Sequence, residues 1–339
     1  TRDDPALERI KGITYLRRDG HMNFTGYEIA IPAAEFLDPD FSILEEYSRI
    51  ENFIGDPLSR FDFAQDPRAH EAHRVGKKMS TVVSTKGCVA RCTFCHRWDK
   101  GFRADPVDDI IRRIRYLMEH YNVGFIQFGD ENFGSDRRQL DELIGAIKPL
   151  DVLYKVGGVR CRSVDPDLLR RMKESGCVAL YYGMESGSPD ILQVMEKNTS
   201  LEENLNAARW THEAGLYTVC QLVLGMPGET ETTISETIEF LKSATESLPE
   251  SPTRRLSINY TQALPGTPVY EYARANGLIG RSLEDEEEYL WTISDSDAAV
   301  DTMNYTSSDH LTVQSWRQKI VAETVGHYYR HNKLPTAGA

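Results

Sequence analysis

The sequence lacks any apolar run of about 18 residues, the minimum that a membrane-spanning helix requires. We therefore expect no membrane span, and without a secretory signal we expect a cytoplasmic protein. Basic residues are scarce, since 39 lysines and arginines stand against 52 aspartates and glutamates and leave a net charge of −13. Because binding to phosphate backbones requires a positive surface, this balance argues against a nucleic-acid partner.

Cysteines are also few, with six in 339 residues, which excludes the dense disulfide framework of a small secreted domain. Three of them, Cys88, Cys92 and Cys95, crowd into one short segment, a pattern that favours a metal or cluster site. The other three are scattered along the chain, and we expect them to be buried as small apolar side chains. They are Cys161, Cys177 and Cys220.

From residue 79 onward, short apolar strands alternate with amphipathic helices in six units, which predicts a parallel sheet with right-handed crossovers. Six units are too few for a closed eight-fold barrel. The sequence therefore predicts an α/β fold, a partial (β/α)₆ TIM-like barrel, with its site at the C-terminal ends of the strands. The predicted strands are 79–84, 123–128, 152–156, 177–182, 216–224 and 256–261.

Helix signals lie between these strands. Asp105 and Ser188 are expected to cap the helices that follow them, and Ser200 with Glu203 forms a capping box. The predicted helices are 105–121, 135–148, 165–175, one that opens at 188–189 and restarts at 200, then 230–247 and 268–276.

The two ends of the chain differ from this core. Residues 1–75 have weak periodicity and predict an irregular N-terminal lead-in, and residues 76–275 predict the barrel. Residues 276–339 predict a helical C-terminal extension, in which an acidic stretch at 281–301 precedes a helix at 308–332.

The segment 86–95, Lys-Gly-Cys-Val-Ala-Arg-Cys-Thr-Phe-Cys, follows the first predicted strand. Its three thiolates can hold one cubane iron–sulfur cluster, and they leave one iron without a protein ligand. That iron can bind a small molecule through an amine and a carboxylate. A zinc ion with His96 as its fourth ligand is the alternative, although structural zinc sites usually pair two short arms from separate places.

The spacing Cys88-x₃-Cys92-x₂-Cys95, with Phe94 before the last cysteine, resembles the signature of the radical S-adenosylmethionine (SAM) superfamily. The similarity extends over about residues 76–275. It implies one [4Fe–4S] cluster on the three cysteines with SAM at the open iron, and no second cluster, because no cysteine follows Cys220. Further segments resemble the branch that also has a cobalamin-binding domain: Phe128–Phe133, Gly183–Ser188, Met195–Lys197, Leu224–Glu229 and Leu264–Pro268.

The resemblance also implies that the loops after the strands bind SAM. Each position has a structural alternative, such as a helix-entry turn, a rim salt bridge or a helix cap. Gln221 and Tyr260 alternate with apolar neighbours in their strands and are candidate substrate contacts. The implied cofactor contacts are Phe94 beside the cluster or adenine; Gly129, Asp130 and Glu131 near the amino group, where Gly-Asp-Glu replaces the commoner Gly-Gly-Glu; Arg160 and Lys197 near the carboxylate; Glu185 and Ser186 near the ribose or methionine part; and Gly225 and Pro265 beside the adenine.

The activity implied by the resemblance is reductive cleavage of SAM to a 5′-deoxyadenosyl radical, which abstracts hydrogen from a small-molecule substrate. The electron would come from a donor such as flavodoxin or ferredoxin. Residues 7–27 resemble the end of a cobalamin-binding domain, whose remainder would lie upstream of Thr1, and this favours C-methylation or cyclisation with cobalamin. A cobalamin-free dehydratase or rearrangement enzyme is one alternative. An RNA-modifying methylthiotransferase, which would need a basic appendage, and a non-catalytic zinc module are the others.

Overall fold

The computed structural model describes residues 7–26, 41–96, 101–293 and 303–332. The chain divides into two compact units, Thr1–Asp38 and Pro39–Ala339. In the first unit, strands β1 (Thr14–Leu16) and β2 (Met22–Phe24) form an antiparallel hairpin after a 3₁₀ turn at Leu7–Arg9. The hairpin turn contains Gly20, whose φ of 83° is the left-handed conformation that glycine tolerates.

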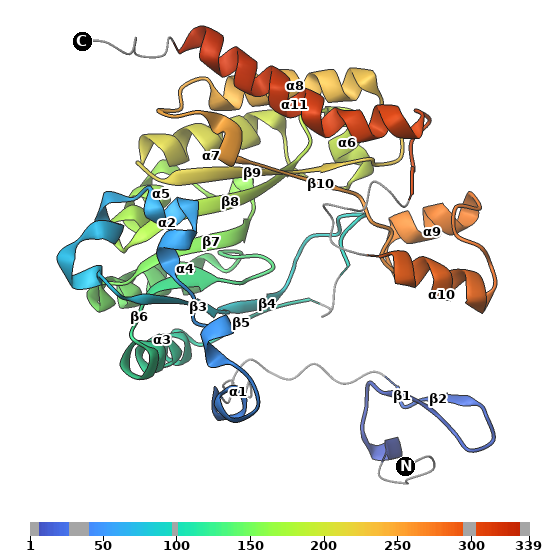
Figure 1. Ribbon diagram of the computed structural model, residues 1–339, viewed down its shortest axis with the longest axis horizontal. Helices are drawn as coiled ribbons and strands as arrows, with labels where there is room; N and C mark the ends of the chain where they lie inside the picture. The colour runs from blue at the N-terminus through green and yellow to red at the C-terminus, as the bar shows by residue number, and fades with distance from the viewer. Residues whose placement is uncertain (1–6, 27–40, 97–100, 294–302, 333–339) are drawn as a thin grey trace. The chain divides into compact units, whose positions relative to one another are not determined.

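The second unit is built on a six-stranded parallel sheet that curls into half of a barrel (Figure 1). The strand order is β10-β9-β8-β7-β6-β3, so that each strand lies beside the next parallel strand along the chain. This arrangement confirms the predicted partial barrel. The strands are β3 (Lys78–Val82), β6 (Val123–Phe128), β7 (Leu153–Val159), β8 (Cys177–Glu185), β9 (Tyr217–Leu224) and β10 (Leu256–Tyr260).

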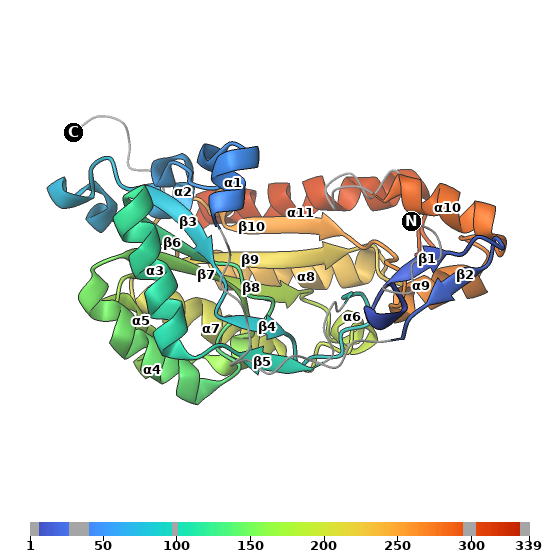
Figure 2. The ribbon, with the colours of Figure 1, turned by 90° about the horizontal axis from the view of Figure 1, so that it is seen from below.

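Helices cover the convex face of this sheet, as the edge-on view shows (Figure 2). Their apolar stripes and alternate strand residues form one core, in which Ile114, Leu222 and Trp316 are completely buried. The helices that connect or cover the strands are α3 (Val107–Tyr121), α4 (Arg137–Ile147), α5 (Pro166–Glu174), α6 (Pro189–Val194), α7 (Leu201–Glu213), α8 (Glu231–Thr245) and α11 (His310–His331).

Most helix starts follow the predicted signals. Ser200 and Glu203 form the capping box, and Asp165 accepts the Leu168 amide at 2.8 Å. One predicted cap, Asp105, is wrong. The Asp105 carboxylate pairs with Arg113 while α3 begins after Pro106.

Ser188 occupies the predicted N-cap position of α6, and Pro189 follows it as the first helical residue. Its hydroxyl, however, makes no capping bond and is buried without a hydrogen-bond partner among the described residues. The hydroxyl of Ser186 accepts the Ser188 amide at 3.1 Å. The helix start was therefore predicted correctly, whereas the capping bond was not.

The segment before β3 packs against the concave face of the sheet. Short 3₁₀ turns flank α2 (Phe61–Ala64), and the ring of Phe63 lies 5.2 Å from that of Phe125 in an edge-to-face contact. Asp62 accepts hydrogen bonds from Lys155 and from Tyr181, both at 2.7 Å. This segment therefore closes the N-terminal half of the barrel interior.

The C-terminal region adds α9 (Pro268–Ala275) and α10 (Leu283–Thr292) and ends in α11, which packs on α8. The acidic stretch contributes to α10, and its remainder, residues 294–301, lies outside the described residues. Among the described residues, none of the helices has the length and hydropathy needed to cross a bilayer.

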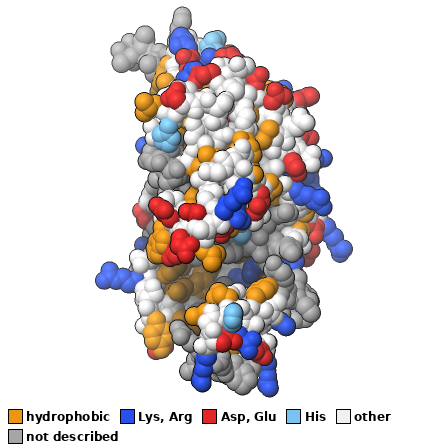
Figure 3. Space-filling model, turned by 90° about the vertical axis from the view of Figure 1, so that its right-hand side faces the viewer, with side chains coloured by type: hydrophobic (Ala, Val, Ile, Leu, Met, Phe, Trp, Pro, Cys, Tyr) orange, Lys and Arg blue, Asp and Glu red, His pale blue; other side chains and the backbone are white. Residues whose placement is uncertain are grey.

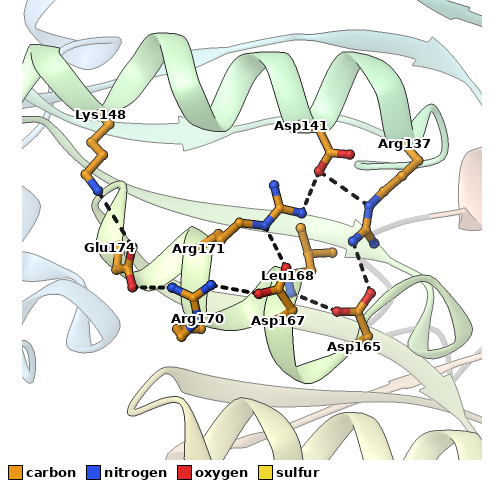
Figure 4. Close-up of polar contacts among 9 residues, drawn as sticks. All are labelled: Arg137, Asp141, Lys148, Asp165, Asp167, Leu168, Arg170, Arg171 and Glu174. Atoms are coloured by element: carbon orange, nitrogen blue, oxygen red, sulfur yellow. Dashed lines mark hydrogen bonds and ion pairs between the residues drawn. The ribbon is translucent and has the colours of Figure 1, made fainter.

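Charged side chains lie interspersed on the surface, as the view toward the strand C-terminal ends shows (Figure 3). Exposed ion pairs also join neighbouring outer helices (Figure 4). Arg171 of α5 reaches Asp141 of α4 at 2.7 Å, and Arg137 of α4 reaches Asp165 at 3.0 Å.

Candidate cofactor site

The cysteine segment leaves β3 and is closed by a short ladder that the sequence did not predict. Strands β4 (Thr85–Gly87) and β5 (Phe102–Ala104) pair antiparallel on either side of the segment. Since this ladder lies beside the C-terminal end of β3, it holds the cysteines at the edge of the sheet where the other loops meet.

Hydrogen bonds fasten the cysteine loop to two neighbouring loops. The Thr93 amide donates to Met195 O at 3.0 Å and its hydroxyl donates to Val194 O at 2.9 Å. The Thr93 carbonyl accepts the Val269 amide at 3.2 Å, and a ring nitrogen of His96 lies 3.0 Å from Pro265 O. The loop is therefore held on one side by the end of α6 and on the other by the start of α9.

The three thiols differ in exposure: Cys92 is buried, Cys88 is half-buried and Cys95 is exposed. A hydrogen bond between the Cys92 and Cys95 thiols lowers the pKa of Cys92 to about 6, against the opposite effect of burial and with help from the nearby Lys197 ammonium. The same hydrogen bond raises the pKa of Cys95. A site that favours a thiolate at Cys92 has the chemistry that iron ligands require.

The donor set of the trio fits an iron–sulfur cluster. Its three free cysteines supply the thiolates by which proteins hold such clusters. Structural zinc usually takes four ligands from two short arms of the chain, and this segment supplies one arm.

Glu185 and Lys197 form a buried ion pair beside Cys92. The ammonium of Lys197 lies 2.5 Å from Glu185 Oε1, and Glu185 ends β8 with a left-handed φ of 64°. Burial lowers the pKa of Lys197, but the charges of Glu185 and Cys92 outweigh it and raise the pKa above its usual value. A Cβ at Gly183 would come 2.4 Å from Glu185 Oε1 and 2.8 Å from Lys197 Nζ, so a larger residue there requires the charged ends of this pair to move.

Arg160 binds backbone carbonyls near this pair. Its guanidinium donates to Lys197 O at 3.0 Å and approaches Asn198 O at 3.5 Å. Glu196 and Asn198 have positive φ values of 49° and 53°, which non-glycine residues seldom adopt. Arg160 thus fixes the turn that carries Lys197.

The loop after β6 meets the loop of β7 through its backbone. The Asp130 carboxylate accepts from Ser84 at 2.8 Å and from Thr85 at 2.6 Å, so its side chain fastens the start of β4. Burial raises the pKa of Asp130 to about 6 against these hydrogen bonds. A Cβ on Gly158, whose φ is 64°, would lie 2.7 Å from the carbonyls of Asp130 and Glu131.

The remaining predicted cofactor residues lie on the loops after β8, β9 and β10. Ser186 is buried, and its hydroxyl lies 3.3 Å from that of Thr237. Gly225 has a φ of 81°, and its amide donates to the buried carboxylate of Glu229. Phe94 packs against an apolar cluster that includes Met226 and Ala263, and thus brings the cysteine loop beside Gly225 and Pro265.

The two substrate-contact candidates face opposite ways. Gln221 is half-buried on the concave face, where register places Asn259 beside Val223. Tyr260 lies on the helix-covered face, and its hydroxyl donates to Val313 O at 3.2 Å and Gln314 O at 3.1 Å. Tyr260 therefore does not line the concave face as predicted, whereas its neighbour Asn259 lies on that side.

Residues that the sequence pattern missed lie deeper on the concave face. Lys155 and Asp62 are almost fully buried as an ion pair, and Tyr181 donates to the same carboxylate oxygen. The sequence does contain one indication of this pair. Lys155 stands within an apolar strand, and a buried ammonium requires a partner of opposite charge. Its carboxylate comes from α2, which the weak periodicity of residues 1–75 did not indicate.

Residues 82–241 match the Radical SAM superfamily. An uncharacterized methyltransferase of Pyrococcus horikoshii is 28% identical over 60% of this chain and 44% of its own length. An anaerobic magnesium-protoporphyrin IX monomethyl ester cyclase of Cereibacter sphaeroides is 26% identical over 68% of this chain and 35% of its own length. The chain thus spans less than half the length of these curated relatives.

Two solved structures show the same fold at low sequence identity. The radical SAM methyltransferase TsrM of Kitasatospora setae, with cobalamin and a [4Fe–4S] cluster bound, has a TM-score of 0.51 and 18% identity, over 62% of this chain and 42% of that one. The cobalamin-dependent radical SAM enzyme OxsB, with aqua-cobalamin and SAM bound, has a TM-score of 0.52 and 16% identity, over 92% of this chain and 42% of that one.

Proposed function

We propose that the chain is a radical SAM enzyme that cleaves SAM reductively and abstracts hydrogen from a small-molecule substrate, because residues 82–241 match the Radical SAM superfamily. The observation that carries this proposal is the cysteine loop, anchored by Thr93 at the strand edge with Cys92 beside Lys197. When bound, the [4Fe–4S] cluster and SAM supply a 5′-deoxyadenosyl radical that takes a hydrogen atom from the substrate.

In this proposal, Cys88, Cys92 and Cys95 hold the cluster, and the loops around them hold SAM. Lys197 provides a cation for the SAM carboxylate, and Glu185 keeps that cation in place through their 2.5 Å contact. At the loop after β6, the amino group is received by backbone carbonyls and by Asp130. Its Oδ1 binds Ser84 and Thr85, and its buried Oδ2 has no hydrogen-bond partner among the described residues. The other SAM contacts are Phe94, Gly129, Glu131, Arg160, Ser186, Gly225 and Pro265.

The substrate lies on the concave face of the sheet in this proposal. Gln221 and Asn259 supply hydrogen bonds there, and both are half-buried on neighbouring strands. The floor beneath them is closed by α2 through the packing of Phe63 on Phe125, which excludes water from that end. A dry interior protects a radical from side reactions.

We further propose that the reaction is C-methylation or cyclisation with cobalamin in a cytoplasmic enzyme. The names of the Pyrococcus and Cereibacter relatives and the 92% coverage of this chain by OxsB support this subtype. Residues 1–75 then lead from a cobalamin-binding region into the radical SAM core at 76–275, and 276–339 form an extension. An electron carrier such as flavodoxin or ferredoxin completes the system.

Anaerobic purification and reconstitution test the core of the proposal. We expect a brown protein with about four irons and four sulfides per chain that converts SAM to 5′-deoxyadenosine when reduced by dithionite. Cys92→Ala should lose the cluster and the product, whereas Cys177→Ala, at a buried cysteine of β8, should keep both. A colourless wild-type protein with one zinc per chain would contradict the proposal.

A further inference from the structure

Two histidines and a glutamate meet where α8 ends beside α11, which runs along it (Figure 1). Helix α8 returns from the C-terminal end of β9 to the N-terminal start of β10. Its last turn therefore lies at the end of the sheet opposite the cysteine loop. This group of side chains is thus separate from the candidate cofactor site.

The three side chains have the spacing of a metal-ligand set. His327 and His331 lie one turn apart on the same face of α11, with ring centroids 4.1 Å apart. His331 Nε2 lies 3.7 Å from Oε1 of Glu246, the residue that ends α8. One donor atom from each of the three side chains lies within 4.8 Å of the other two.

Other contacts hold the two helices together without using these donor atoms. The buried Tyr328 donates its hydroxyl to Leu248 O at 3.1 Å, and the Asn332 side-chain amide donates to Glu246 O at 3.0 Å. The backbone beside each donor is thus fixed across the contact between the helices. The site is therefore preorganised, and an ion would lose little binding energy in ordering it.

The electrostatics of this position favour a cation. Glu246 stands at the C-terminus of α8, where the helix dipole already presents negative partial charge and a carboxylate is unfavourable. One turn earlier on each helix, Glu239 and Glu323 both contact Lys242, at 2.8 and 3.6 Å, so that two carboxylates surround one ammonium. A divalent cation bound at Glu246 would offset this excess of negative charge.

The donor set indicates which cation fits. Calcium and magnesium prefer oxygen ligands, whereas two imidazole nitrogens and one carboxylate oxygen suit zinc. Tetrahedral zinc with bonds of about 2.0–2.2 Å needs donor atoms roughly 3.4 Å apart. His331 and Glu246 are exposed and can rotate, so a small closure of the three side chains achieves this spacing. Water would take the fourth position.

We propose that Glu246, His327 and His331 bind one zinc ion, which joins the end of α11 to the end of α8. The ion ties the C-terminal extension to the barrel at a point that the hydrophobic core does not reach, because two of its three ligands are exposed. This zinc site does not depend on the proposed function, and it stands whether or not the chain cleaves SAM.

The test adds zinc to the cluster-loaded protein. We expect one zinc per chain in addition to the iron, and a melting temperature that rises with zinc concentration. X-ray absorption at the zinc edge separates this site from the cysteines, since nitrogen and oxygen ligands lie at about 2.0–2.1 Å and sulfur lies at about 2.3 Å. A spectrum dominated by sulfur ligands would contradict the proposal.

Variants separate a zinc site from a simple ion pair. His331→Ala should weaken zinc binding by at least about 100-fold, more than the usual loss of an outer-sphere partner, and should abolish the rise in melting temperature. His331→Lys keeps a cation beside Glu246 but removes the ligand, so it should also lose zinc.

His120→Ala, at an exposed histidine of α3, is the control and should bind zinc like the wild type. If His331→Ala and Glu246→Gln both keep wild-type zinc affinity, the proposed site is refuted. A wild-type protein that binds no zinc beyond its iron would refute it equally.

Discussion

At the scale of single residues, the site depends on a few close approaches. Glycine occupies the positions where a side chain would strike a neighbouring functional group or backbone. Gly183 leaves room for the Glu185–Lys197 pair, and Gly158 lets the β7 loop touch the carbonyls of Asp130 and Glu131. Because these contacts join different loops, each glycine serves the whole site.

Gly183→Ala should damage the site. Its Cβ would stand 2.4 Å from Glu185 Oε1, so the pair beside Cys92 must shift. We expect formation of 5′-deoxyadenosine to fall by about 100-fold, the cost of misplacing reacting groups by roughly an ångström. Gly145→Ala is the control: it lies in α4 with open space around it, and we expect about 0.5–1 kcal/mol of added stability. Equal activity in the two variants would refute this role for Gly183.

At the scale of elements, buried and half-buried ion pairs fasten the segment before β3 to the barrel. Lys155 and Asp62 bind α2 to β7 across the concave face. Asp66 pairs with Arg68, in the 3₁₀ turn that follows α2, at 2.8 Å and with Lys173 of α5 at 3.0 Å. These contacts give a segment without a helical pattern a fixed place in the fold.

Breaking one partner of the Lys155–Asp62 pair should destabilise the protein strongly. Asp62→Ala leaves the ammonium buried without its carboxylate, and we expect a loss of about 3–5 kcal/mol in the free energy of unfolding measured with urea. The double variant Asp62→Leu with Lys155→Met removes both charges and should recover most of that loss. A double variant as unstable as Asp62→Ala would show that packing and not charge dominates.

Asp66 should make stability depend on acid pH. Burial alone would raise its pKa, but hydrogen bonds from Arg68 and Lys173 lower it to about 2, below the usual value near 3.8. The stabilisation is thus complete above about pH 4 and is lost as pH falls through 2.

Asp66→Asn should therefore be less stable than the wild type at neutral pH, by about 1–2 kcal/mol after allowance for solvent screening. The difference in the free energy of unfolding should shrink from pH 4 to pH 2. A difference that stays constant over this interval would rule out Asp66 as its source.

Individual strands show how much of the fold could be predicted from the sequence. β6 was predicted to the residue because Val123–Phe128 is mostly apolar, with Gln127 as its one polar side chain, and is bounded by Asn122 and Gly129. β7 and β8 extend beyond their predicted ends, because glycines interrupted the pattern and the strands continue through register shifts. The three cysteines could be proposed as cluster ligands from the sequence alone, because all three lie in one segment.

Other features could not be read from the sequence. Alternation in β10 separates its two faces but does not say which is concave, and Tyr260 lies on the face that α11 covers. The Glu185–Lys197 pair depends on the left-handed turn at 196–198, which has no local sequence signal. The β4–β5 ladder joins two three-residue strands, too short for a periodicity to be visible.

At the scale of the molecule, the second unit shares one large core between sheet and helices. Trp316 of α11 is completely buried in that core, to which Tyr260 of β10 also belongs. The C-terminal extension therefore belongs to the folding unit of the barrel.

Trp316→Ala should lower the free energy of unfolding by about 3–5 kcal/mol, the usual cost of a cavity of this size, measured by thermal or urea unfolding. Trp291→Ala, at a side chain that is 82% exposed in α10, should change stability by no more than about 0.5 kcal/mol. A Trp316 variant as stable as the Trp291 control would mean that α11 is dispensable to the barrel.

The ladder of β4 and β5 has a consequence for how a change in it would spread. Because it pairs residues 85–87 with residues 102–104, the two ends of the segment that carries the cysteines lie side by side. A substitution that breaks this pairing therefore displaces that segment from both of its ends at once.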